Sequence, residues 1–260
     1  MTRNIGKTMI TPVAIVTGAS RGIGRACAVA LAAAGFALYL VADGTEAELA
    51  QASDDCTAAH PQRVASASGI VDLDDPDAAP AIVAAALETF SRIDVLVNNA
   101  GIRARKPFGD FTSADFDRLI AVNLRAPFLL SQAVLPAMRA QGGGRIVHIA
   151  SQLGLVSDAG AALYGVTKAG LIHLARAMAL ELAPLNIYVN AVSPGPVGTE
   201  FFMERLRAQP DELARRLRDI PAARLGTPEE IADVVVFLAT TKASFLQGSN
   251  LVIDGGYIAH

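Results

Sequence analysis

Three side chains near the middle of the chain have the types and spacing needed to exchange a proton with a substrate oxygen. Tyr164 and Lys168 stand four residues apart in a segment rich in helix formers, so they share one face of a predicted helix. A free phenol titrates near pH 10, but a neighbouring ammonium favours its phenolate. Ser151 ends an apolar run at 145–150, and its hydroxyl is suited to holding the same oxygen. Together they suit proton transfer to a carbonyl or from an alcohol.

A tyrosine and a lysine at this spacing also arise by chance in many chains. The simpler interpretation makes Tyr164 an amphipathic core residue and Lys168 a solvated surface charge. The two interpretations are separated only by the elements that surround the pair.

A glycine-rich turn near the N-terminus predicts a nucleotide-binding site. A short apolar strand at 13–16 leads into it, and a helix to about residue 34 follows. Glycines let a backbone approach a diphosphate, and a helix N-terminus presents free N–H groups to it. The alternative is a tight turn that needs glycine for its backbone alone. The segment reads Thr17-Gly18-Ala19-Ser20-Arg21-Gly22-Ile23-Gly24.

Short apolar strands alternate with helical segments along the rest of the chain. Further strands are predicted at 37–41, 64–71, 94–97, 145–150, 187–192 and 250–253, and helices at 46–59, 74–90, 112–138, after 160 and at 227–239. A charged helical insert at 200–220 is expected to cover a site. The alternation predicts an α/β fold: one doubly wound Rossmann-type domain over 12–260, with about seven parallel strands covered by helices on both faces. Residues 1–11 are expected to form a flexible leader.

Composition excludes several classes of function. A formal charge of −3 over 260 residues argues against a nucleic-acid binder, which needs a concentrated basic face. No apolar run approaches the ~18 residues of a membrane span, and the N-terminus lacks a secretory signal. Cys27 and Cys56 make no disulfide framework, and no histidine or cysteine cluster supports a metal site. We expect a cytoplasmic protein.

Several motifs in order resemble the classical short-chain dehydrogenase/reductase family, over roughly 12–256. The turn at 17–24 is similar to the family's dinucleotide turn, and 98–101 to its strand-four motif. Asn123, Ser151, Tyr164 and Lys168 match the family's catalytic set, and Pro194-Gly195 with Val197 and Thr199 match its nicotinamide segment.

The resemblance implies an enzyme that transfers a hydride between NAD(P)(H) and a ketone or secondary alcohol. It implies that Tyr164 donates or takes the proton and that Ser151 holds the oxygen. It further implies that Lys168 lowers the Tyr164 pKa and binds the ribose, and that Asn123 fixes a water beside Lys168. The cofactor contacts it implies are Gly18, Ser20, Arg21, Gly22, Ile23, Gly24, Asp43, Asp72, Asn98, Ala100, Gly101, Tyr164, Lys168, Pro194, Gly195, Val197 and Thr199.

The choice between NAD and NADP stays open. The acid that selects a free 2′-hydroxyl in such proteins is expected at Ala42, whereas Asp43 stands one residue later. Arg21 could pair with a 2′-phosphate, but an acid beside that position would repel it.

The substrate also stays open. Family members that reduce 3-oxoacyl groups on a carrier protein place arginines where this chain has Gly142 and Leu185. That argues against a carrier-protein substrate, although the arginines of the insert could replace them. Arg103, Arg105 and Lys106 border the expected cleft, where they could bind a substrate carboxylate or form a solvated loop. These insert arginines are Arg205, Arg207, Arg215, Arg216 and Arg218.

Two further alternatives concern activity and assembly. A catalytically idle, dinucleotide-binding sensor is the rival to the enzyme. The resemblance implies a homotetramer built on the helix regions 127–138 and after Tyr164, both of which are apolar over much of their circumference. A monomer whose apolar surface is covered by the insert is the alternative.

Overall fold

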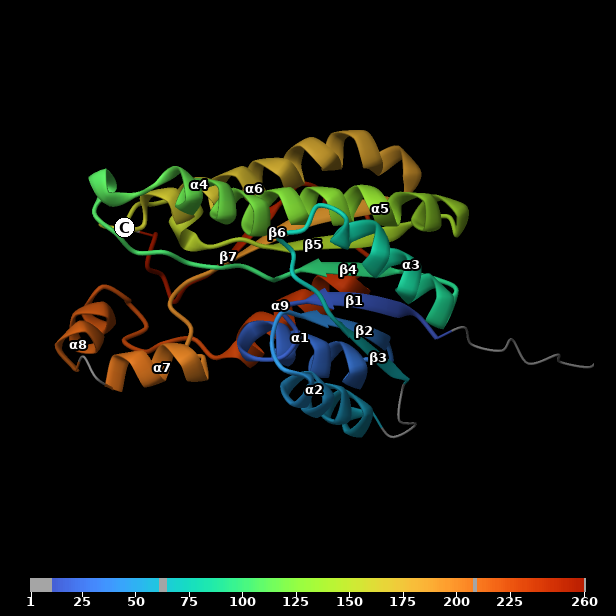
Figure 1. The fold of residues 1–260 in the computed structure, drawn as a ribbon, viewed down its shortest axis with the longest axis horizontal. Helices are drawn as coiled ribbons and strands as arrows, with labels where there is room; N and C mark the ends of the chain where they lie inside the picture. The colour runs from blue at the N-terminus through green and yellow to red at the C-terminus, as the bar shows by residue number, and fades with distance from the viewer. Residues whose placement is uncertain (1–10, 61–64, 208–209, 260) are drawn as a thin grey trace, which may run out of the picture.

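A parallel sheet forms the centre of the molecule (Figure 1). A computed structural model describes residues 11–60, 65–207 and 210–259, and the predicted leader lies almost wholly outside them. Within these ranges the strands are β1 (Val13–Thr17), β2 (Ala37–Ala42), β3 (Ser66–Ile70), β4 (Val95–Asn98), β5 (Gly144–Ile149), β6 (Ile187–Pro194) and β7 (Asn250–Ile253). Their order is β3-β2-β1-β4-β5-β6-β7, and every pair is parallel. The order reverses between β1 and β4, which places a ligand-binding switch point at their carboxyl ends.

Helices cover both faces of the sheet, which confirms the predicted doubly wound fold (Figure 1). One buried cluster joins the sheet to α1 (Gly22–Ala33), α2 (Glu46–Ala59) and α9 (Pro228–Thr240). A second joins its other face to α3 (Ala78–Phe90), α5 (Ala126–Ala140) and α6 (Ala162–Leu182). Strands β1, β2 and β4 are buried at every residue, as apolar strands between two helical layers must be.

The long helix predicted at 112–138 has a π-helical interruption. It consists of α4 (Ser113–Ile120), the π-helical stretch η2 (Ala121–Arg125) and α5. Thr112 and Asp115 form a capping box at its start. Asn123 lies inside η2, and π-helical turns are frequent at functional sites.

This continuous run, Ser113–Ala140, is long and apolar enough to cross a membrane by length and composition. Half of its most apolar window is nevertheless buried inside the protein, and α5 contributes Leu130, Val134 and Met138 to the core. It therefore packs as a core helix does, and the expectation that no apolar run approaches the length of a membrane span was wrong for this run.

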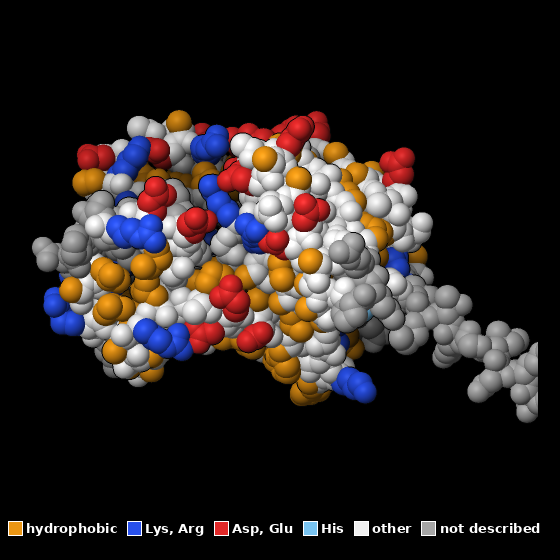
Figure 2. All heavy atoms as spheres, turned by 90° about the horizontal axis from the view of Figure 1, so that it is seen from below, with side chains coloured by type: hydrophobic (Ala, Val, Ile, Leu, Met, Phe, Trp, Pro, Cys, Tyr) orange, Lys and Arg blue, Asp and Glu red, His pale blue; other side chains and the backbone are white. Residues whose placement is uncertain are grey.

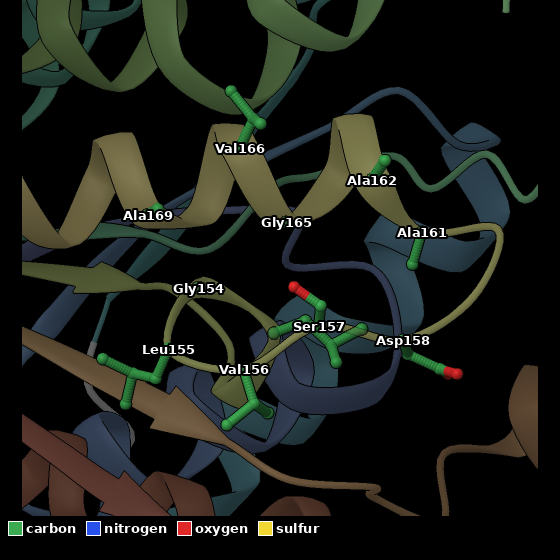
Figure 3. Close-up of a pocket in the computed structure, with 11 residues that line it drawn as sticks. Gly154, Leu155, Val156, Ser157, Asp158, Ala161, Ala162, Gly165, Val166 and Ala169 are labelled. Carbon is green, nitrogen blue, oxygen red and sulfur yellow. The ribbon is translucent and has the colours of Figure 1, made fainter. Parts of the chain in front are cut away.

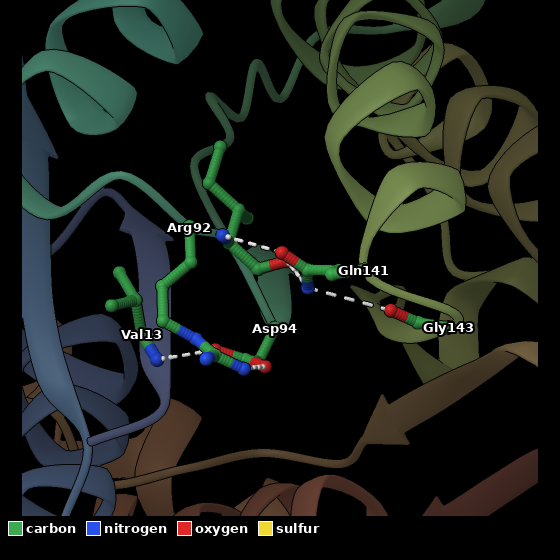
Figure 4. A network of polar contacts seen from close by, with 6 residues as sticks. Val13, Arg92, Asp94, Gln141 and Gly143 are labelled. Carbon is green, nitrogen blue, oxygen red and sulfur yellow. Dashed lines mark hydrogen bonds and ion pairs between the residues drawn. The ribbon is translucent and has the colours of Figure 1, made fainter. Parts of the chain in front are cut away.

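A polar network fixes the amino edge of the sheet (Figure 4). The Asp94 carboxylate accepts hydrogen bonds from the Val13 N–H at 2.7 Å and from Arg92 Nε at 2.8 Å. Gln141 donates from Nε2 to the Ile93 carbonyl at 2.5 Å. These contacts hold the starts of β1 and β4 to the turn before β5, so the strands reach the opposite edge in a fixed register.

The remaining differences from prediction lie in loops and in the insert. Helix α3 begins four residues late, because Asp72 and Asp75 accept hydrogen bonds from N–H groups two residues on and form turns instead. The insert is two helices, α7 (Glu200–Arg207) and α8 (Pro210–Arg218), beyond the carboxyl edge. Figure 2 shows hydrophobic and basic side chains together on the surface of this α7–α8 lobe. Short 3₁₀ turns are η1 (Phe108–Asp110), η3 (Gln152–Gly154) and η4 (Ala183–Leu185).

Candidate active site

The structure brings Ser151, Tyr164 and Lys168 together at the carboxyl end of β5. Tyr164 is half-buried and Lys168 is 4% exposed, one turn further along α6. The Lys168 amine lies 5.7 Å from the Tyr164 ring centre and donates to the Ile149 carbonyl at 2.8 Å. The lysine therefore ties α6 to the end of β5. Its burial excludes the solvated surface charge that was the simpler interpretation of this residue.

Two glycines let the Ser151 loop lie directly on α6. A β-carbon on Gly154 would lie 2.8 Å from the Lys168 carbonyl carbon, and one on Gly165 would lie 2.8 Å from the Leu153 oxygen. Any larger residue would push the loop away from the helix. The Ser151 hydroxyl accepts from the Leu153 N–H at 3.1 Å and is hydrogen-bonded to Tyr164. The loop thus presents the serine beside the phenol.

The electrostatics of Tyr164 differ from the expectation. Burial raises the pKa of its phenol above the ordinary value, while the Arg103 charge and the Ser151 hydrogen bond act in the opposite direction. Lys168, which was expected to lower the Tyr164 pKa, is itself desolvated, and burial lowers its own pKa to about 8. Tyr164 consequently stays protonated at neutral pH, which suits donation of a proton to a carbonyl oxygen.

Asn123 joins the catalytic helix to the loop after β4. Its fully buried side chain donates to the Ile102 carbonyl at 2.9 Å and to the Thr167 hydroxyl at 3.1 Å, and accepts from the Ile102 N–H at 2.8 Å. Thr167 in turn donates to the Tyr164 carbonyl at 2.7 Å. The side-chain amide is therefore engaged by protein groups, and its support of a water beside Lys168 stays a prediction.

The glycine turn has the form of a phosphate cradle. Gly18 and Gly22 have φ angles of +65° and +56°, and a β-carbon on Gly24 would lie 2.0 Å from the Gly18 oxygen. Helices α2, α4 and α9 each begin with a capping box. Within the described chain, α1 instead begins without a side-chain cap or an acid in its first turn. Its first N–H groups are available to an anion, so the turn fits a dinucleotide diphosphate.

Asn99, which was absent from the predicted contacts, holds this turn in place. Its side-chain amide donates to the Thr17 carbonyl at 2.8 Å and to the Gly18 carbonyl at 3.2 Å. The Thr17 hydroxyl accepts from the N–H groups of Asn99 and Ala100, both at 3.0 Å. Thr17 and Asn99 therefore join the ends of β1 and β4 at the switch point.

The Asn98 side chain, predicted to bind cofactor, is directed into the core instead. It is 1% exposed, donates to the Ser131 hydroxyl at 3.3 Å and lies 3.2 Å from His148 Nδ1. Strand alternation explains the difference, because consecutive side chains point to opposite sides and Asn98 still belongs to β4. His148 is a buried core histidine within hydrogen-bond distance of Asn98, and burial lowers its pKa to about 3.

The segment 194–199 lies between the glycine turn and the Ser151 loop. Gly195 donates its N–H to the Ile253 carbonyl at 2.9 Å, and Val197 forms a β-bridge with Gly226. A β-carbon on Gly22 would lie 3.2 Å from the Thr199 methyl, and one on Gly195 would lie 2.9 Å from Gln152 Oε1. That buried amide oxygen has no hydrogen-bond partner among the described residues, and the sequence interpretation had missed it.

The end of β2 lies beside the glycine turn, and β3 ends next to β2. Asp43 and Asp72 are both exposed there. A β-carbon on Gly44 would lie 3.3 Å from the Ser20 hydroxyl and 2.6 Å from the Glu48 carboxylate. The Glu48 pKa is lowered chiefly by its hydrogen bonds to Thr45, with a smaller contribution from the Arg21 charge. Acidic and basic groups meet at this end, so the choice of cofactor stays open.

A separate pocket of about 220 Å³ lies against the outer side of α6 (Figure 3). Ala162, Gly165, Val166 and Ala169 line it from the helix, and residues 153–158 line it from the loop. At helical spacing Ala162, Val166 and Ala169 lie on the side of α6 away from Tyr164 and Lys168, and Gly165 lies at the border between the two sides. The pocket is therefore distinct from the proton-transfer site.

Comparisons with known proteins show the family of the chain. A family model described as Enoyl-(Acyl carrier protein) reductase matches residues 18–258. A 3-oxoacyl-[acyl-carrier-protein] reductase of Synechocystis is 39% identical over 254 residues, covering 95% of this chain and 96% of the relative. An NAD-dependent glycerol dehydrogenase of Listeria innocua is 35% identical over 245 residues, covering 94% and 93%.

Solved structures give the same result. A putative NAD(P)-dependent gluconate 5-dehydrogenase from Beutenbergia cavernae, with bound NADP, superposes with a TM-score of 0.89 at 36% identity. The match covers 97% of this chain and 98% of that one. The matches to the family model and to these relatives cover the same part of the chain as the sequence motifs and the sheet. The chain belongs to the short-chain dehydrogenase/reductase family.

Proposed function

We propose that the protein is an NAD(P)(H)-dependent oxidoreductase that interconverts a ketone and a secondary alcohol, with Tyr164 as the proton donor or acceptor. The observation that supports this most strongly is the convergence of Ser151, Tyr164 and Lys168 at the end of β5, at the same edge of the sheet as the uncapped N-terminus of α1. The nicotinamide of a bound dinucleotide would supply or accept the hydride.

In this mechanism the protein binds the dinucleotide, orients the substrate and protonates the substrate oxygen. The glycine turn and α1 hold the diphosphate, and the segment 194–199 borders the nicotinamide end. Ser151 donates a hydrogen bond to the substrate oxygen, and Tyr164 transfers its proton to that oxygen during reduction. The Lys168 ammonium lies near the phenol and stabilises the phenolate that is left.

The test is Tyr164→Phe, with Tyr188→Phe as the matched control. Tyr188 is near the amino end of β6, where it contacts Arg145, far along the sheet from Ser151. We expect Tyr164→Phe to lower kcat by about 10²- to 10⁴-fold and to leave dinucleotide affinity nearly unchanged. The control should keep its activity. Unchanged turnover in Tyr164→Phe would reject the assignment, and absence of turnover by the wild type with any carbonyl would favour the idle sensor.

A 3-oxoacyl-thioester reductase is the second candidate, favoured by relatives of that name such as the Synechocystis protein. Gly142 and Leu185 stand next to the amino ends of β5 and β6, at the edge of the sheet opposite Ser151. Comparing a 3-oxoacyl thioester with simple ketones, each with NADH and NADPH, distinguishes the two candidates.

We also propose a cytoplasmic homotetramer. Large apolar side chains are exposed on the two helices α5 and α6, which cover the same face of the sheet. Val166 and Leu180 on α6 are 58% and 83% exposed, and Phe128 on α5 is 43% exposed. On α6, the small residues Ala162, Gly165 and Ala169 border the pocket and would allow a second helix to approach. Sedimentation at micromolar concentration tests this: a species near four times 27.0 kDa is expected, and a single species at that monomer mass would contradict it.

A further inference from the structure

The loop at 102–106, between β4 and α4, is fixed at both ends by groups outside it. At its start, the Asn123 side chain binds both the N–H and the carbonyl of Ile102, at 2.8 and 2.9 Å. At its end, the Lys106 N–H donates to the Gly160 carbonyl at 3.1 Å. The Lys106 amine contacts both oxygens of Asp115, at 2.8 and 2.6 Å. The backbone between these ends therefore has a defined position.

The same loop is fastened to the segment that leads into α6. Arg105 forms an ion pair with Asp158 and donates to the Ala159 carbonyl at 2.8 Å. Both side chains of the ion pair are about one-quarter exposed or less, at 25% and 21%. Arg105 and Lys106 thus act as anchors of the loop, which replaces the solvated loop considered from the sequence.

These anchors place Arg103 over the ring of the proton donor. The central carbon of its guanidinium lies 5.4 Å from the Tyr164 ring centre, while the side chain remains exposed. The Arg103 charge is also close enough to lower the Tyr164 pKa against the effect of burial. A guanidinium presents a planar fork of donors that matches a carboxylate better than an ammonium does.

We propose that Arg103 binds the carboxylate of the substrate, so that the enzyme acts on a short oxo acid or the corresponding hydroxy acid. This inference rests on the proposed function and narrows its substrate class. The carbonyl oxygen must reach the Tyr164 hydroxyl while the guanidinium lies over the ring of the same residue. The carboxylate and the reacting carbon are therefore only a few bonds apart.

The first experiment compares free oxo acids with their methyl esters. We would measure kcat and KM for 2- and 3-oxo acids of four to six carbons, for 4-oxo acids of five and six carbons, and for each ester. The variants are wild type, Arg103→Gln and Arg139→Gln, where Arg139 is exposed in the last turn of α5. Wild type and the control should prefer one acid over its ester. Arg103→Gln should lose about 10- to 100-fold for the acid, through KM, and little for the ester.

Two results would overturn the inference. One is an unchanged preference for acid over ester in Arg103→Gln. The other is a wild type that reduces neutral ketones but none of the acids. A wild type that turns over no carbonyl would instead reject the proposed function itself.

The second experiment separates the two proposals by binding alone. It compares Tyr164→Phe with the double variant that also carries Arg103→Gln. Each protein is saturated with NAD⁺ or NADP⁺, and calorimetry measures how tightly it binds the hydroxy acid. We expect Tyr164→Phe to bind the acid and the double variant to bind it at least 10-fold more weakly. Equal affinities would reject the role of Arg103 whether or not Tyr164 proves catalytic.

Discussion

Lys168 should make the protein less stable at neutral pH than a chain with an apolar residue there. Its amine is almost fully buried and desolvation lowers its pKa from 10.5 to about 8. A shift of about 2.5 pKa units corresponds to about 3 kcal/mol against folding with the lysine charged. Lys168→Met keeps an unbranched side chain only one heavy atom shorter and removes this cost. It also leaves the Ile149 carbonyl without its partner, an opposing loss of about 1–2 kcal/mol.

The pH dependence isolates the charge from the lost hydrogen bond. Between pH 8 and 10.5 the unfolded chain holds a proton on Lys168 that the folded chain has released, so wild-type stability rises with pH in that window. Below pH 8 both states are protonated and the full cost is present. Lys168→Met lacks a titrating group at this position, so this pH-dependent contribution to its stability is absent. The stability of Lys168→Met relative to wild type should therefore fall by about 2–3 kcal/mol as the pH rises from 7 to 10.

Urea unfolding at fixed protein concentration measures this difference. Lys242→Met, which replaces an exposed lysine, is the control and should differ from wild type by the same amount at both pH values. A difference between wild type and Lys168→Met that stays constant with pH, or grows, would refute the claim that burial of the charge is costly. Lys168→Met should also bind the dinucleotide weakly if Lys168 contacts the ribose.

Two other substitutions test the loop contact and the cofactor choice. Gly154→Ala should lower kcat by at least tenfold and the free energy of unfolding by about 1–3 kcal/mol, because its β-carbon would lie 2.8 Å from the Lys168 carbonyl carbon. Dinucleotide affinity should be nearly unchanged, and wild-type kcat would show that the contact does not position Ser151. Asp43→Ala should raise the ratio of kcat/KM for NADP over NAD by about tenfold. An unchanged ratio would mean that the exposed Asp43 carboxylate does not face the ribose.

Element types could be predicted because the sequence patterns were strong. The apolar strands alternate with helices, and Thr45, Thr112 and Thr227 cap helices three residues before an acid. The predicted ends of the helices were wrong where side chains compete for the hydrogen bonds of the backbone. Asp72 and Asp75 delayed α3 in this way. The π-helical turn at Asn123 depends on tertiary contacts that have no local pattern.

The site was predicted by residue type better than by orientation. Ser151, Tyr164 and Lys168 do converge, but which of Asn98 and Asn99 faces the glycine turn depends on where β4 ends. The influence of Arg103 on Tyr164 depends on a loop fixed from three other segments, which spacing along the chain does not reveal. The direction of the Tyr164 pKa shift depends on burial, which becomes known only with the fold.

The way the loop at 102–106 is attached has a consequence for engineering. Its anchoring partners, Asn123, Asp115, Asp158 and Gly160, all belong to other parts of the chain. Such a segment behaves as an exchangeable cassette: residues 103 and 104 can be replaced while Ile102, Arg105 and Lys106 retain their contacts. A library confined to those two positions would vary what faces Tyr164 without disturbing the dinucleotide turn. Substitutions at these two positions can thus change the substrate preference with little loss of stability.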